Sequence, residues 1–369
     1  TIHSHIEHLE LCTLLISVSS QLHVNIRATT FLIVRFLSLI NVDFEKCIFV
    51  PAIVTFFGEL GCTEWAKQIY SKYIDPNPNS LYHKTAVYNF SNVLIEQLET
   101  IFVYICTIRE YHKRCTRQCT HISSQGPLRL VAKTLLEELY CTIQKMSDTP
   151  EALFHKAQYY FLKAFSYRFD GFHRKSTTAV GVTGNLLNLL FEKVKNPLLA
   201  TKAKIYHTFY MSGSSGEWVT QKLSQVNKCN LSNLKCKLLF KGVVIMLFYH
   251  RLENSTHHML GNCVGDAFFA TKSLSNGKHY RCRLLSRLAD ILNLNLNHRL
   301  DISQLKIKQS FIHISRKRKD LLWLRLFPNY ALMKCKSLAY LIANFPWIPN
   351  SPLPAFESVT HPDLVLLAY

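Results

Sequence analysis

Apolar residues recur along this chain at the three- and four-residue spacing of amphipathic helices, and short polar or proline-containing turns interrupt them. The pattern is clearest after residue 148. Thr149-Pro150-Glu151 supplies an N-cap side chain, a proline for the first turn and an early acid. Asp170-Gly171 is expected to end the same helix. Within it, residues at helical spacing predict one buried face: Leu153, Ala157, Tyr160, Phe161, Ala164 and Phe165.

The same rhythm predicts helices along most of the chain. They span residues 9–19, 26–40, 51–60, 63–73, 84–109, 127–145, 177–195, 197–210, 216–225, 234–252, 259–273, 280–292, 302–327 and 329–342. Parts of residues 305–314 alternate apolar and polar residues, which also suits a strand, and helix is the favoured interpretation there. The fold prediction is all-α, with antiparallel helical hairpins stacked as an α-solenoid or helical-repeat array.

Composition agrees with a large helical core. The chain has 369 residues, of which 48% are hydrophobic, with only 12 Gly and 12 Pro for tight turns. We expect an N-terminal helical region over residues 1–126 and a helical-repeat region over residues 127–369, or one continuous array of both. The most apolar tracts, residues 12–26 and 47–58, are too short or too interrupted for a membrane span, so no membrane association is expected.

The chain is strongly basic, and this charge indicates which kinds of partner to expect. It has 43 Lys and Arg against 24 Asp and Glu, a formal net charge of +19, and 17 His besides. Such a charge favours an acidic protein segment, nucleic acid or an anionic surface, and it also suits a merely solvated helical exterior. The 12 Cys are scattered through apolar patterns, which favours a reducing compartment, nuclear or cytoplasmic.

Part of the helix after Thr149 resembles the tetratricopeptide repeat. Ala157, Phe161 and Ala164 have the A-x3-F-x2-A spacing of the second helix of that repeat. The resemblance covers about one helix. Phe169 stands where the family has proline, and the aromatic, Leu-Gly and Tyr series of the preceding helix is missing at Cys141, Gln144, Lys145 and Asp148. The resemblance implies a divergent helical hairpin and protein binding on a concave surface, without catalysis.

One short segment combines metal ligands with cations. His112, Cys115, Cys119 and His121 place four zinc-ligand side chains within ten residues. Lys113, Arg114 and Arg117 lie among them and make the locality suited to an anion. Three interpretations stay open: a zinc site, an anion-contacting basic loop and a solvated helix end.

Two further basic groups are candidates for binding a partner or an anion. Arg316, Lys317, Arg318 and Lys319 form the densest basic run, which suits nuclear import, phosphate contact or a solvated face, and we expect it to be exposed. The other group requires neighbouring helices to bring its members together: Arg168, His173, Arg174, Lys175, Lys193, Lys195, Lys202 and Lys204.

No catalytic motif accompanies these charges. Residues 181–185 lack the Lys-Ser/Thr of a phosphate-binding loop, and neither a Gly-x-Ser-x-Gly nor a His-Glu-x-x-His motif occurs. The prediction is a non-enzyme without a cofactor, a scaffold or adaptor that binds a protein partner through a basic groove as a subunit of a complex. The alternatives are a nucleic-acid-binding helical protein and a regulatory or structural arm of a larger enzyme complex.

Overall fold

All the regular elements that the structure describes are helices, which confirms the all-α prediction for this part of the chain. The computed structural model describes residues 50–59, 66–67, 69–71, 74, 83–114, 125–146, 149–195, 197–211, 232–249, 254–275 and 280–292. By contact density the chain divides into two units, residues 1–93 with 320–369 and residues 94–319. The boundary predicted at residues 126/127 falls inside the second unit and stays a prediction.

The described part of the first unit consists of α4 (Val50–Glu59), three short stretches near Tyr70 and the beginning of α6 (His83–Arg114). The two helices approach closely at Gly58, where a Cβ atom would lie 2.2 Å from Val93 Cγ2. Asn89 Nδ2 donates a hydrogen bond to the carbonyl oxygen of Pro51 at 3.0 Å. This hydrogen bond ties the first turn of α4 to α6.

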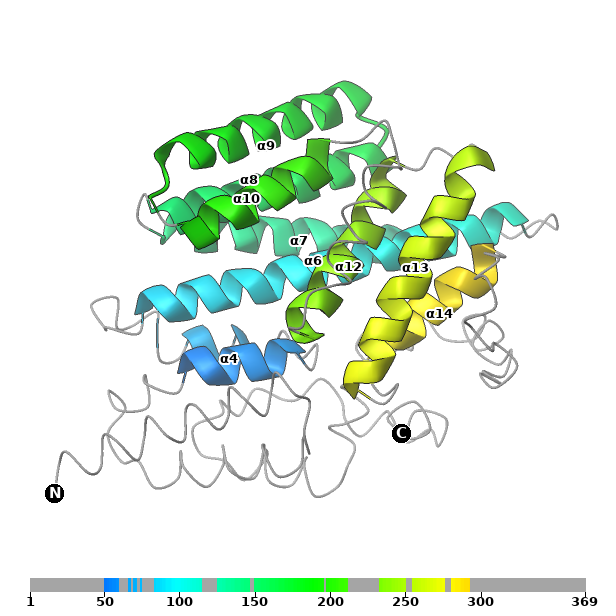
Figure 1. Cartoon of the computed structure of the whole chain (residues 1–369), viewed down its shortest axis with the longest axis horizontal. Helices are drawn as coiled ribbons and strands as arrows, with labels where there is room; N and C mark the ends of the chain where they lie inside the picture. Colours follow the sequence, from blue (N-terminus) through cyan, green and yellow to red (C-terminus); the bar gives the residue numbers. More distant parts are fainter. Residues whose placement is uncertain are drawn as a thin grey trace, which may run out of the picture. The chain divides into compact units, whose positions relative to one another are not determined.

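In the second unit, neighbouring helices in the sequence are neighbours in space (Figure 1). Four helices follow one another in this way: α7 (Gln125–Gln144), α8 (Pro150–Phe169), α9 (His173–Lys193) and α10 (Pro197–Met211). Here α8 packs on α7, α9 on α8 and α10 on α9. The same holds for α12 (Ser232–Tyr249), α13 (Asn254–Ser275) and α14 (Tyr280–Leu292).

Both ends of α8 follow the chemistry predicted for them. Thr149 is the N-cap, and its hydroxyl accepts a hydrogen bond from the Ala152 N–H at 3.2 Å. At the other end the Phe172 N–H donates to the Tyr167 carbonyl at 2.8 Å and the Gly171 N–H to the Arg168 carbonyl at 3.3 Å. Gly171 has φ +82°, so these bonds form a Schellman motif that stops the helix.

Small residues let α8 and α9 approach closely. Ser176 Oγ donates to the carbonyl oxygen of Ala164 at 2.9 Å, and Thr183 Oγ1 to that of Ala157 at 3.3 Å. Both alanines are fully buried, as predicted from their spacing. A larger side chain at either alanine would hold the two helices apart.

The prediction of a single buried face on α8 is wrong in part. Leu153 and Tyr160 are only half-buried, whereas Phe154, His155 and Gln158, outside the predicted set, are buried. The reason is that α6, α7, α9, α10 and α12 contribute neighbours to α8, so that burial covers most of its circumference.

Some boundaries differ from the sequence prediction. The helix predicted to end at Arg109 continues to Arg114, and the helix predicted to begin at Thr177 begins at His173. Basic residues are favourable near a helix C-terminus, so the cations after Arg109 extend α6 rather than end it. The predicted helices before residue 50 and after residue 292, and the helix at 216–225, lie outside the described residues. None of the helices described above combines the length and hydropathy that a bilayer crossing requires.

Candidate interaction surface

Three of the predicted binding residues flank the turn from α8 to α9. Arg168 lies in the last turn of α8, and Arg174 and Lys175 lie in the first turn of α9. Between them the Gly171 turn presents Phe172, whose exposed fraction is 51%. We call Arg168, Phe172, His173, Arg174 and Lys175 the basic corner.

The interactions inside the basic corner leave its outer part cationic. Arg168 is half-buried, with its guanidinium carbon 4.8 Å from the centre of the Phe248 ring. The nearby Asp170 is engaged by Lys133 at 2.9 Å, so its charge is matched by α7. Lys175 lies over the exposed Phe172 ring, 5.0 Å from its centre, and Arg174 is also exposed. The corner therefore presents cations beside an exposed aromatic ring, a combination suited to an acidic protein segment.

The other predicted cations with described side chains lie at the end of α9, just after it and on α10. Lys193, Lys195 and Lys204 are exposed, as Arg174 and Lys175 are. At 1.5 Å per residue, Arg174 and Lys193 are separated by about 28 Å along α9. This exceeds the Debye length of about 8 Å at physiological ionic strength. At this separation Arg174 and Lys193 act independently of each other, so Lys193 is not counted in the basic corner. A single basic surface over all of these cations stays a prediction.

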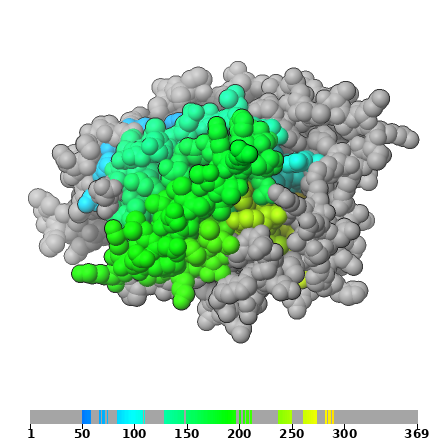
Figure 2. Space-filling model, turned by 90° about the horizontal axis from the view of Figure 1, so that it is seen from above, coloured from blue at the N-terminus to red at the C-terminus, as the bar shows by residue number. Residues whose placement is uncertain are grey.

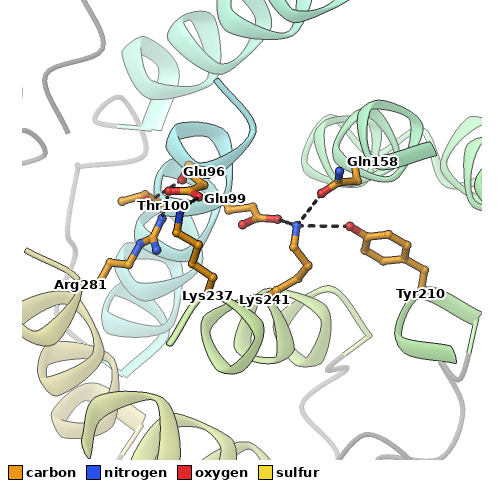
Figure 3. Close-up of polar contacts among 8 residues, drawn as sticks. All are labelled: Glu96, Glu99, Thr100, Gln158, Tyr210, Lys237, Lys241 and Arg281. Carbon is orange, nitrogen blue, oxygen red and sulfur yellow. Dashed lines mark hydrogen bonds and ion pairs between the residues drawn. The ribbon is translucent and has the colours of Figure 1, made fainter. Parts of the chain in front are cut away.

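A buried ion pair lies inside the second unit (Figure 3). The Lys241 ammonium of α12 donates to the Glu99 carboxylate of α6, and both side chains are almost fully buried. The same ammonium donates to Gln158 Oε1 at 3.0 Å and to the Tyr210 hydroxyl at 3.4 Å. It also lies 5.0 Å from the centre of the Tyr206 ring. All three ammonium donors are engaged, so this cluster connects four helices and has the composition of a structural network.

A second carboxylate on α6 receives two cations. Glu96 contacts Lys237 Nζ at 2.8 Å and Arg281 Nη2 at 3.0 Å, which brings α12 and α14 to α6. The Arg281 guanidinium carbon lies 4.7 Å from the centre of the Phe240 ring. Burial alone would raise the pKa of Glu96, but the two cations outweigh it and lower this pKa from 4.5 to about 2.

The Glu96 pKa predicts acid sensitivity. Since the pKa of Glu96 is lower in the folded protein than in the unfolded chain, its stabilisation is present above pH 4.5 and is lost as the pH falls toward 2. The loss should reach about 3 kcal/mol, because each pKa unit corresponds to ~1.36 kcal/mol. Urea unfolding of the wild type and Glu96→Gln across this range measures it. Parallel pH curves for the two proteins would contradict the assignment.

The sequence analysis did not find this network, although one signal was present. Lys241 is the single charge in the apolar run from Leu238 to Tyr249. A helix that is apolar on all sides is usually buried, so a lysine in its middle requires an opposite charge nearby. The sequence does not indicate which acid supplies that charge, because Glu99 lies 142 positions away.

Several predicted site residues lie outside the described residues. They are Cys115, Arg117, Cys119, His121 and the basic run Arg316, Lys317, Arg318 and Lys319. His112, Lys113 and Arg114 belong to the last turn of α6, but the structure does not describe their side chains. Within the described part, no group of three or more His, Cys, Asp or Glu side chains is arranged to hold a metal ion. The zinc and basic-run hypotheses therefore stay predictions.

The described cysteines are not paired with each other. Cys236, Cys263 and Cys282 are buried thiols, as their apolar sequence context indicates. Burial and the charge of Asp266 raise the pKa of Cys263 to about 12, so its thiol stays protonated at neutral pH.

Comparison with known proteins identified no relative. No protein-family model, no curated protein and no solved structure matches this chain.

Proposed function

We propose that this chain is a non-catalytic helical scaffold or adaptor that binds a protein partner by an acidic segment lying on the basic corner. The observation that carries the proposal is the juxtaposition at the α8–α9 turn of an exposed Phe172 with the exposed cations Arg174 and Lys175. An aromatic anchor among cations matches a partner with carboxylates around an apolar side chain.

The packing of the second unit supports the scaffold part of the proposal. Consecutive helices pack on each other, and hydroxyl–carbonyl bonds join α8 to α9 over small residues, as in a helical hairpin of a repeat array. We propose this array as the framework that presents the basic corner. Its likeness to the tetratricopeptide repeat rests on Ala157, Phe161 and Ala164.

The proposal is tested by reversing charges at the corner. In Arg174→Glu/Lys175→Glu we expect the Kd for a labelled extended peptide rich in Glu, with one central Phe, to rise about tenfold or more, the equivalent of ~1.4 kcal/mol. The control Lys193→Glu/Lys204→Glu makes the same change in net charge at exposed lysines outside the basic corner. It should change Kd less than about threefold. Fluorescence anisotropy at about 50 and 200 mM salt measures both.

A single-stranded oligonucleotide is the second probe in the same experiment. If it binds and the peptide does not, with an affinity that falls steeply with salt, the protein recognises nucleic acid and the protein-partner proposal is wrong. Equal effects of the two variants on peptide binding would mean that net charge, and not the corner, governs association.

A further inference from the structure

Between residues 152 and 165 the accessible part of α8 is a single narrow stripe. Residues 149, 153, 156, 160, 163 and 167 are half-buried, and between residues 152 and 165 the other side chains of the helix are buried. Their separations of four and three residues place them along one line of the helix surface. Figure 2 shows the side of the second unit on which α7 to α10 form a continuous face.

The centre of this stripe alternates cations with tyrosines. Its order is Lys156, Tyr160, Lys163 and Tyr167, which we call the Lys–Tyr stripe. An ordinary solvated face would carry charges of both signs, but the only acid of α8 is Glu151 in its first turn. A stripe that holds both positive charge and aromatic area is suited to a partner surface with carboxylates and apolar groups.

Contacts around Lys163 hold part of the stripe in place. The Lys163 ammonium lies 5.3 Å from the centre of the Tyr159 ring and 5.9 Å from that of Tyr167. Burial opposes its charge, but a hydrogen bond to Tyr159 and the charge interactions with tyrosines raise the Lys163 pKa, so it is a cation at neutral pH. Tyr159 in turn packs 5.4 Å from Tyr140 of α7, whose exposed fraction is 45%. Aromatic neighbours thus limit the freedom of the cation, which reduces the entropy lost on binding.

The stripe ends at the basic corner. The Phe172 N–H donates to the Tyr167 carbonyl, so the chain turns back directly where the stripe stops. A partner lying along α8 would therefore reach the cations and the exposed ring of the corner.

We infer that the Lys–Tyr stripe is a docking site for an acidic amphipathic helix of the protein partner. This inference rests on the proposed function and names the secondary structure of the bound segment. Lys156 and Lys163 are seven residues apart, as are Tyr160 and Tyr167, and each pair is separated by about 10.5 Å along the axis.

The seven-residue spacing selects a helix over an extended peptide. Residues i and i+7 of a partner helix repeat at the same ~10.5 Å, so carboxylates at this spacing can meet both lysines while apolar residues between them meet the tyrosines. An extended segment repeats its same-face side chains every ~6.6 Å, which does not match.

The test compares two peptides of equal composition. Each has about 20 residues, a length at which helix formation is practicable. One places Glu at i and i+7 with Leu between them on the same face, and the scrambled peptide disperses the same residues. We expect the patterned peptide to bind at least about tenfold more tightly and to gain helical circular dichroism on binding, because only it can oppose the stripe.

Substitutions locate the binding. Lys156→Glu/Lys163→Glu should weaken binding of the patterned peptide about tenfold or more, since like charges would then face each other. The matched control is Lys193→Glu/Lys204→Glu, for which a change below about threefold is expected. If the first variant does not fold, Lys156→Gln/Lys163→Gln replaces it, with an expected weakening of at least about threefold. Thermal unfolding confirms the fold of each protein.

The outcomes separate this inference from the proposed function. If the stripe variants bind the patterned peptide as the wild type does, or if the scrambled peptide binds equally well, the docking helix is wrong. If at the same time Arg174→Glu/Lys175→Glu still weakens binding of the extended acidic peptide about tenfold or more, the proposed function stands without it. If neither peptide responds to either pair of variants, both proposals fail. A doubling of molecular mass without peptide that Lys156→Glu/Lys163→Glu abolishes would show that a second copy occupies the stripe, and this also overturns the inference.

Discussion

Replacing Phe161 with alanine is expected to lower the free energy of unfolding by about 3 to 5 kcal/mol. Phe161 is fully buried on α8, where its ring stacks on Tyr210 with centres 4.2 Å apart and lies 5.0 Å from the Phe248 ring. The substitution removes one aromatic contact of α8 with α10 and one with α12. It leaves a cavity that these rigid rings cannot fill by small movements, because aromatic side chains have few rotamers.

The matched control is Phe172→Ala. It deletes the same side chain from a position with an exposed fraction of 51%, so a loss within about 0.5 kcal/mol is expected. Urea unfolding of the two variants and the wild type measures both changes. Equal losses in the two variants would show that the packing around Phe161 is misassigned.

Replacing Lys241 with methionine is expected to lower the free energy of unfolding by a similar amount, about 3 to 5 kcal/mol. The substitution keeps a long unbranched side chain but leaves the buried Glu99 carboxylate without its cation. It also removes the ammonium group from which Gln158 Oε1 accepts a hydrogen bond at 3.0 Å. An uncompensated charge in the interior is destabilising because desolvation is no longer offset by attraction.

The double variant Lys241→Met/Glu99→Met distinguishes the charge from the packing. With both charges removed, much of the lost stability should return, since replacing a whole buried pair by apolar residues is often nearly neutral. Lys204→Met is the control for loss of an exposed lysine, with an expected change within about 0.5 kcal/mol. If the double variant is no more stable than Lys241→Met, the network acts through its hydrogen bonds to Gln158 and Tyr210 rather than through the charge pair.

Local chemistry explains where sequence prediction succeeded. The ends of α8 depend on residues within a few positions of each other: Thr149 caps the first turn, and Gly171 adopts the positive φ that stops the last. The burial of Ala157, Phe161 and Ala164 followed from helical periodicity in the same way. The position of Arg168 before the α8–α9 turn and of Arg174 and Lys175 after it is also local, because a tight turn joins the end of one helix to the start of the next.

The sequence by itself therefore determined the all-α class of the described part and the caps of α8. Only the tertiary structure decided which side of α8 stays accessible, since that depends on helices from distant parts of the chain packing around it. The same holds for Lys241, which meets Glu99 across 142 positions. Periodicity reports that a residue is apolar or polar relative to its own helix axis, but it carries no information on which other helix occupies each side. For that reason the Lys–Tyr stripe and the buried network emerged only from the packed structure.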